Sequence, residues 1–201
     1  MIVLKRPDAL LVDNTFCGGS QHWYKRLWQR MGGCGATAAS LLIWYLAQTN
    51  PKYSTLCTIN ARSKNEFLDL MNEMFTYITP RWRGVDSSAK FIAGLFLYLQ
   101  EKEERINGFC CFDVEPKLCA QPDAEHFVEN SLKNDRPVAF LNLQSGNQKH
   151  LDGWHWMVVI AFDPDSGEAH LCDQGKCIVF SLREWVQSTK RGGAFVSINE
   201  I

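Results

Sequence analysis

Cys34 is the residue whose type and setting point most directly to chemistry. It follows Gly32 and Gly33 and opens an apolar stretch that runs to about residue 48, so we expect it at the N-terminus of a buried helix. A cysteine attacks as the thiolate, and the unpaired amides and dipole of a helix N-terminus favour negative charge there. The two glycines permit positive φ angles and a close approach by substrate. Cys34 is the candidate nucleophile; the alternative is a small buried residue in an apolar helix.

Gln29, a few residues upstream of Cys34, can complete an oxyanion site. A primary amide here can donate a hydrogen bond to the oxygen that becomes negative during attack, with the backbone N–H of Cys34 as the second donor. Taken alone, Gln29 is better explained as a surface residue of the stretch Trp28-Gln29-Arg30. Its position before a helix-start cysteine favours the catalytic interpretation.

His155 is the best candidate for a general base among the five histidines. It ends a polar, glycine-containing loop and begins a strongly apolar strand, so its imidazole is expected at a sheet edge, where it can reach a cleft. The flanking Trp154 and Trp156 can shield the site from water. His150, in the preceding loop, is the competing histidine, and a structural role for His155 is the alternative.

Asp173 is the candidate third member of a triad. It ends the next strand of the same hairpin system, where a carboxylate can hold the imidazole in the correct tautomer and orientation. The sequence Asp173-Gln-Gly-Lys176 is also a common turn composition, which explains the aspartate nearly as well.

The elements that must position these residues indicate an α+β fold in a single domain, residues 1–201. The helical part covers about residues 1–135 and the β-sheet part about residues 136–201. Helices are expected at 34–48, after a capping box at Ser63–Glu66, from Ser87–Ser88 to about residue 99, after a cap at Asp123, and after a second capping box at Ser181–Glu184. Strands are expected at 108–115, 138–143, 155–162, 169–173, 177–180 and 194–198, most of them in a curled antiparallel sheet.

The segment 50–120 has no identified function. Its aromatic residues include Trp82, Phe91, Phe96 and Tyr98. They either shape a cleft or belong to the core, and their helical spacing favours the core.

Composition and charge exclude several classes of protein. The formal net charge of −1 gives no reason to expect nucleic acid or an anionic membrane surface as a partner. The longest apolar runs, 40–47 and 91–99, are far shorter than the roughly 20 residues that a membrane span needs. The N-terminus has no secretory pattern, so the sequence predicts a cytoplasmic protein. The oligomeric state cannot be inferred.

The eight cysteines are expected to be mostly buried thiols, since no export signal accompanies them. Cys110 and Cys111 are adjacent in an apolar stretch, which favours this interpretation. The pair Cys172 and Cys177 gives only a weak zinc signal because no second pair with metal-ligand spacing accompanies it. We therefore expect no metal and no cofactor.

Together, the candidate residues resemble a known family. The segment Gln29-Arg-Met-Gly-Gly-Cys34-Gly35-Ala-Thr-Ala-Ala is similar to the start of the bacteriocin-processing peptidases, the double-glycine leader peptidases of the papain-like cysteine peptidase superfamily. His155-Trp156-Met-Val-Val resembles their histidine strand, and Leu171-Cys-Asp173 lies where their aspartate falls. Two departures are Gln174, where the family usually has proline, and Gly33, where aspartate or asparagine is common.

The resemblance implies a papain-like fold, in which the nucleophile helix packs on a C-terminal antiparallel sheet. It implies a cysteine hydrolase that cleaves an amide bond in a peptide or protein substrate. In that mechanism Cys34 attacks, His155 moves the proton, Asp173 orients the imidazole and Gln29 stabilises the oxyanion.

Other interpretations remain open. The same fold hosts acyltransferase and transglutaminase-like enzymes, and an inactive domain can bind peptides in the cleft. A metal or redox protein that uses its many cysteines is the third alternative.

Overall fold

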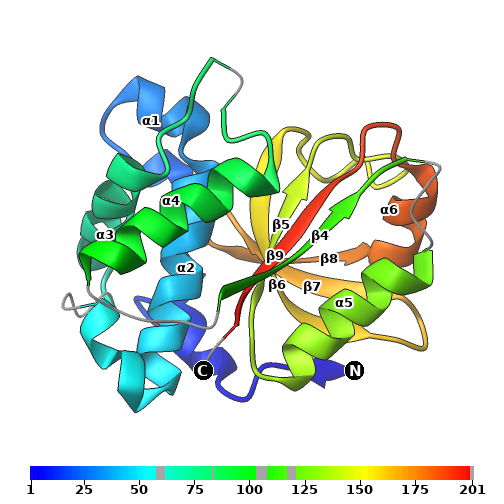
Figure 1. Cartoon of the computed structure of the whole chain (residues 1–201), viewed down its shortest axis with the longest axis horizontal. Coiled ribbons are helices and arrows are strands. Elements are labelled where there is room, and N and C mark those ends of the chain that lie inside the picture. The colour runs from blue at the N-terminus through cyan, green and yellow to red at the C-terminus, as the bar shows by residue number, and fades with distance from the viewer. Residues whose placement is uncertain (58–61, 83, 103–107, 117–120, 200–201) are drawn as a thin grey trace.

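Mixed helix and antiparallel sheet make up the structure, a computed structural model that describes the chain except residues 58–61, 83, 103–107, 117–120 and 200–201. Figure 1 shows helices α1 to α4 gathered beside one side of the sheet and α5 and α6 beside the other. The helices are α1 (Leu27–Gly32), α2 (Cys34–Thr49), α3 (Lys64–Tyr77), α4 (Ser88–Glu101), α5 (Gln121–Lys133) and α6 (Leu182–Ser188). The 3₁₀ turns are η1 (Pro7–Leu10), η2 (Gln21–Trp23) and η3 (Pro51–Leu56).

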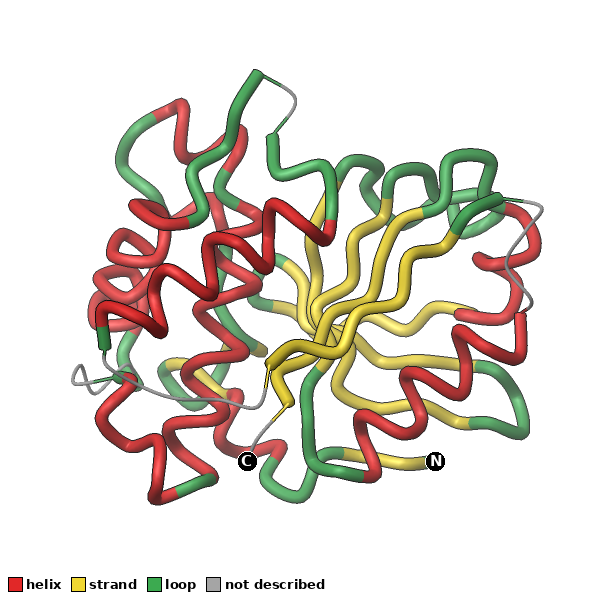
Figure 2. The backbone as a smooth tube through the Cα atoms, viewed as in Figure 1, coloured by secondary structure: helices red, strands yellow, loops and turns green. Residues whose placement is uncertain are grey.

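The main sheet has seven strands within the described residues, in the order β4-β9-β5-β6-β7-β8, with β1 pairing on β6. All its pairings are antiparallel, and Figure 2 shows the strands fanning out as they cross, which makes the sheet strongly twisted. A small second sheet joins β2 to β3. The strands are β1 (Ile2–Val3), β2 (Leu11–Val12), β3 (Phe16–Cys17), β4 (Gly108–Val114), β5 (Val138–Asn142), β6 (His155–Asp163), β7 (Glu168–Asp173), β8 (Lys176–Ser181) and β9 (Gly193–Asn199).

The α+β class is therefore confirmed, with one change to the expected division near residue 135. Strands β1 and β4 come from the N-terminal part of the chain and still belong to the main sheet. The predicted strand at 108–115 corresponds to β4, which pairs with β9 at the edge of the sheet. The boundary between a helical part and a sheet part is consequently not a single point in the sequence.

Helix α2 is the central helix, and 13 of its 16 residues are buried. It contacts α3 and α4 on one side and strands β5 and β6 on the other. Its apolar residues surround the helix, as expected for an element enclosed on all sides. This packing fixes the position of its first residue, Cys34, relative to β6.

The two faces of the sheet are covered by different helices. Neighbouring residues on a strand point to opposite faces. Trp156 of β6 stacks on Phe91 of α4, with ring centroids 4.2 Å apart. Phe140 of β5 pairs with Met157, the residue after Trp156, and so points to the other face. There its ring contacts Trp185 of α6, with ring centroids 4.7 Å apart. Helices α4 and α6 thus lie on opposite faces.

The local capping predictions are correct in part. The capping box at Ser63 is present in full, because the Ser63 side chain accepts from the Glu66 N–H and the Glu66 carboxylate accepts from the Ser63 N–H. At Ser181 only half of the predicted box is present: the side chain caps the Glu184 N–H, but the Ser181 N–H donates to Gln148. Asp123 does not cap α5: it lies within the first turn of the helix, which begins at Gln121. A carboxylate there still stabilises the helix through the dipole.

The aromatic residues of the middle segment divide between core and surface. Phe91 and Tyr98 are fully buried, as the core interpretation predicted. Phe96 is half exposed and the Trp82 side chain is 97% exposed, so for these two residues the core interpretation is wrong. Phe96 lies on the outer side of amphipathic α4, and Trp82 lies in the loop before that helix. In the part of the chain that the structure describes, no helix has both the length and the apolar character to cross a membrane.

We expect Phe140→Ala to lower the free energy of unfolding by about 3–5 kcal/mol. Phe140 is fully buried and contacts three other aromatic rings, Phe180, Trp185 and Phe195, so its removal leaves a cavity in the α6 side of the core. Urea denaturation followed by circular dichroism measures the change. Phe96→Ala is the matched control, and an equal loss of stability in both variants would contradict this packing.

Candidate active site

Cys34 is the first residue of α2, as predicted, and only 8% of it is exposed. Gly33 separates α1 from α2 and has a negative φ of −83°, so the expected positive φ is wrong for this glycine. The need for glycine is steric instead. A Cβ here would lie 2.4 Å from the Tyr24 ring and 2.5 Å from the Gln29 carbonyl oxygen. The absent side chain lets α1 turn tightly into α2 and brings Tyr24 against the start of α2.

His155 and Asp173 meet at the same edge of the sheet. His155 is the first residue of β6 and Asp173 is the last residue of β7, and because these neighbouring strands are antiparallel the two ends lie side by side. The His155 Nε2 atom lies 2.7 Å from Asp173 Oδ1. Both side chains are nearly buried, which protects this hydrogen bond from competition by water.

The imidazole of His155 and the thiol of Cys34 line the same small cavity, and the two groups interact electrostatically. The pKa of His155 reflects all of these contacts. Burial lowers the pKa of His155, while the hydrogen bond to Asp173, the interaction with Cys34 and the charge on Asp173 raise it, and the net result is a rise from 6.5 to about 10. The structure therefore brings Cys34, His155 and Asp173 together and favours a positively charged imidazole between the other two.

Gln29 is not brought to this site. It lies in α1, and its Nε2 donates to Asn72 Oδ1 of α3 at 3.1 Å. Its side chain lines a separate surface hollow between α1 and α3, together with Lys25 and Asp69. The sequence interpretation placed the oxyanion donor at the nearest upstream amide, but α1 carries that amide away from the thiol.

Gln21, rather than Gln29, lies beside Cys34 and His155. It begins η2 and lines a small cavity of about 20 Å³ with Cys34, His155 and Asp173. Its Oε1 atom is buried and has no hydrogen-bond partner among the described residues. A cavity of this size holds about one water molecule, and an unpaired buried amide oxygen beside it is the kind of group that functional sites retain. The sequence signal was the phrase Gly18-Gly19-Ser20-Gln21, which the sequence analysis did not single out.

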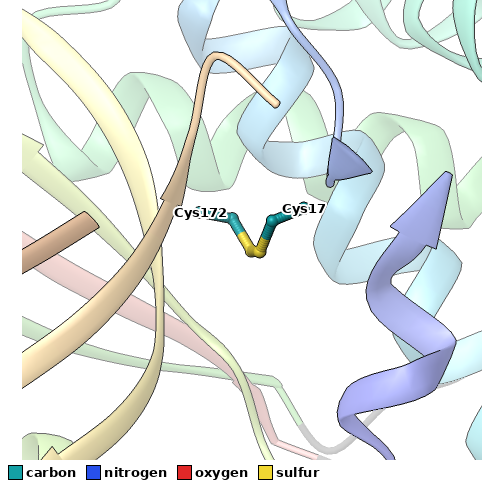
Figure 3. The surroundings of a disulfide bond; sticks show 2 residues. All are labelled: Cys17 and Cys172. Carbon is teal, nitrogen blue, oxygen red and sulfur yellow. A yellow bond between two sulfur atoms is a disulfide. The ribbon is translucent and has the colours of Figure 1, made fainter. Parts of the chain in front are cut away.

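The segment that carries Gln21 is attached to the turn that follows Asp173. Figure 3 shows the disulfide between Cys17 and Cys172, which joins the N-terminal segment to strand β7. The Cys17 N–H donates to the Gly175 carbonyl at 3.0 Å, and the Gly175 N–H donates to the Gly19 carbonyl at 3.0 Å. Two distant parts of the chain are thereby held together at the site.

This disulfide corrects the expectation of unpaired thiols for Cys17 and Cys172. The two cysteines are 155 residues apart in sequence, and only the contact between β3 and the β7–β8 hairpin makes them neighbours. Cys110 is half-buried and Cys111 is exposed, because β4 is an edge strand. The expectation of mostly buried thiols is therefore wrong: Cys111 and Cys177 are exposed, and of the free cysteines that the structure describes only Cys34 is buried. Cys119 lies outside the described residues.

The zinc signal of Cys172 and Cys177 is not supported. The two residues are directly opposite each other in the β7–β8 pair, but Cys172 is bound to Cys17. No cluster of three or more metal-binding side chains occurs among the residues whose placement is described.

The residues near His155 in the sequence differ in whether they are buried beside the site or face solvent. His150, the competing histidine, lies on the surface, where a ring nitrogen is 3.1 Å from the Val179 carbonyl, so it does not line the cavity. Trp156 is buried, and its Nε1 donates to the Val85 carbonyl. Trp154 is half exposed, has a φ of 57°, and lies under the Arg191 guanidinium at 5.4 Å. Burial by Trp156 is consistent with the predicted shielding, whereas Trp154 faces solvent beside the site.

Comparisons with known proteins add no relative. No protein-family model matches the sequence, and a search of curated proteins finds no match either. The candidate function is therefore argued from the geometry of the site.

We expect the stability of the protein to depend on pH through His155. Because its folded-state pKa is raised, its contribution is fully present below about pH 6.5 and is lost as the pH rises toward 10. As the pH rises from 6.5 to 10, the free energy of unfolding should fall in the wild type and fall less in Asp173→Asn. The difference between the two falls should be at least about 1.4 kcal/mol, the equivalent of one pKa unit. Denaturant titrations at several pH values measure both curves, and parallel curves would contradict the assignment.

Proposed function

We propose that the protein is a cysteine hydrolase that cleaves an amide bond in a peptide or protein substrate, with Cys34 as its nucleophile. The observation that carries this proposal is the position of His155 between the thiol of Cys34 and the carboxylate of Asp173. A buried imidazole with one partner to activate and one partner to orient it is the arrangement of a catalytic triad. The raised pKa of His155 supports an imidazolium that stabilises the thiolate.

The reaction follows from these contacts. His155 takes the proton of the Cys34 thiol, and the thiolate forms a bond to the substrate carbonyl carbon. His155 then gives the proton to the leaving amine as the C–N bond breaks and a thioester forms. Water, deprotonated by His155, attacks the thioester and releases Cys34 as the thiolate.

Gln21 replaces Gln29 as the side chain that stabilises the oxyanion. Its amide borders the cavity that Cys34 and His155 line, and the Cys34 backbone N–H at the start of α2 provides the second donor. The Gln29 side chain bonds to Asn72 on another surface, so it has no role in the proposed reaction.

The family proposed for this chain is the papain-like cysteine peptidases. The confirmed α+β class, the nucleophile at the start of a buried helix and the histidine at the start of an antiparallel strand support it. The segment between Gln21 and Cys34, which contains α1, departs from the sequence pattern on which the resemblance was based.

The disulfide is stronger evidence for the cellular compartment than the N-terminal sequence is. A cytoplasmic location stays a prediction, whereas the Cys17–Cys172 bridge favours an oxidising compartment, in which disulfides form and persist.

Selective alkylation tests whether Cys34 is an activated nucleophile. At pH 6, where an ordinary thiol is almost fully protonated, we expect iodoacetamide to label Cys34 at least about tenfold faster than the exposed Cys177. His155→Ala should abolish this advantage, and Asp173→Asn should reduce it. Mass spectrometry of the digested protein assigns the label, and circular dichroism verifies that each variant is folded. Equal labelling of both cysteines in the wild type would contradict the proposal.

Two glutamine variants test the oxyanion site. Gln21→Ala should lower the rate of acylation by a p-nitrophenyl ester by about 10²–10³, the typical loss for one oxyanion donor. Gln29→Ala should leave that rate unchanged, because its amide bonds to Asn72. The burst of p-nitrophenolate in stopped flow measures the rate. The reverse pattern would restore Gln29 and remove Gln21 from the site.

A further inference from the structure

The residues 17–21 are joined to the end of β7 and to the turn after Asp173 by four contacts. They are the Cys17–Cys172 disulfide, the two backbone hydrogen bonds to Gly175, and a hydrogen bond of 2.7 Å from Ser20 Oγ to Gln174 Oε1. Each contact lies within four residues of Gln21 on one side and within two residues of Asp173 on the other. This connection is the direct structural link between the proposed oxyanion donor and the strand that carries the aspartate.

We propose that the disulfide is a positioning element for Gln21, and that its reduction by a dithiol impairs acyl transfer while the Cys34–His155–Asp173 contacts persist. The inference rests on the proposed function. It adds redox control to that site and assigns a role to Cys17 and Cys172, which the mechanism does not use.

Reduction should affect the two halves of the site differently. Asp173 is held by the pairing of β7 with β6 and β8, and Cys34 is held by the buried helix α2, so neither depends on the bridge. The segment before Gln21 has much weaker support. Strands β2 and β3 have two residues each and pair with each other, β3 adds a single bridge from Cys17 to Gly175, and Gly18 and Gly19 follow at once.

Glycines give this segment conformational freedom once the bridge is open. Gly18 has a positive φ of 69°, and a Cβ on Gly19 would lie 2.5 Å from the Phe67 ring, so both positions require glycine in the oxidised protein. Oxyanion donors act only when they are aimed at the developing charge, and a displacement of about 1 Å can cost about 10² in rate. A small shift of Gln21 is therefore enough for control.

The reduction step is an ordinary thiol–disulfide exchange. A thiolate of the dithiol attacks the Cys17 sulfur, the more accessible of the two because Cys172 is only 4% exposed, and Cys172 leaves and takes up a proton. The second thiolate of the reductant attacks the mixed disulfide and releases Cys17, which is protonated in turn. Two electrons pass to the protein, and the reductant becomes a cyclic disulfide.

Two rates measured on the same protein separate positioning from general structural support. Alkylation of Cys34 by iodoacetamide needs the thiolate and the imidazolium but forms no oxyanion. Acylation by p-nitrophenyl acetate needs the same two groups and also needs the oxyanion donor. We expect reduction with dithiothreitol, followed by anaerobic gel filtration, to lower the acylation rate by up to about 10²–10³ and to leave the alkylation rate of Cys34 nearly unchanged. The double variant Cys17→Ser/Cys172→Ser should match the reduced wild type and should not respond to dithiothreitol.

Two variants sharpen the test. In Gln21→Ala, reduction should cause little further loss of acylation, because two changes that act through one side chain are not additive. Cys177→Ser keeps the bridge and removes the exposed thiol opposite Cys172, so it should respond to reduction as the wild type does.

Several results would overturn the inference. A parallel fall in alkylation and acylation would mean that the bridge only supports the fold, and an undiminished effect of reduction in Gln21→Ala would mean that it acts on another group. An oxidised wild type with neither rapid alkylation nor an acylation burst would reject the proposed function and this inference together. Rapid alkylation with an acylation rate that reduction does not change would reject the inference alone.

Discussion

The antiparallel pairing of β6 with β7 is the constraint on which the site depends. It places the first residue of one strand beside the last residue of the other and so forms the His155–Asp173 hydrogen bond. The packing of α2 against β6 then brings Cys34 to the same edge. Each side chain is positioned by a regular element, which is the arrangement that gives a catalytic group a fixed geometry.

The parts of this framework with a local signal could be predicted from the sequence. The apolar run after Cys34, the β-branched strand after His155 and the capping box at Ser63 each show their structure within one segment. The position of Phe96 could not be predicted in the same way, because which face of a helix is buried depends on the elements that pack beside it.

The proposed oxyanion donor and the disulfide lacked such a local signal. Gln29 is closer to Cys34 along the chain, but the Gln21 side chain lines the cavity beside Cys34, whereas the Gln29 side chain bonds to Asn72. Cys17 and Cys172 are neighbours only after the N-terminal segment has folded against the β7–β8 hairpin. Both features depend on tertiary contacts, and the spacing of residues along the sequence does not reveal these contacts.

Helix α1 has a consequence for tracing the ancestry of this chain. It occupies part of the interval between Gln21 and Cys34, and it has no buried residue, so its length can change without disturbing the core. Natural selection is therefore free to lengthen or shorten this helix while it retains the residues on either side, among them the buried Tyr24. A pattern for detecting homologues should join two short blocks, one ending at Gln21 and one around Cys34, by a gap of variable length.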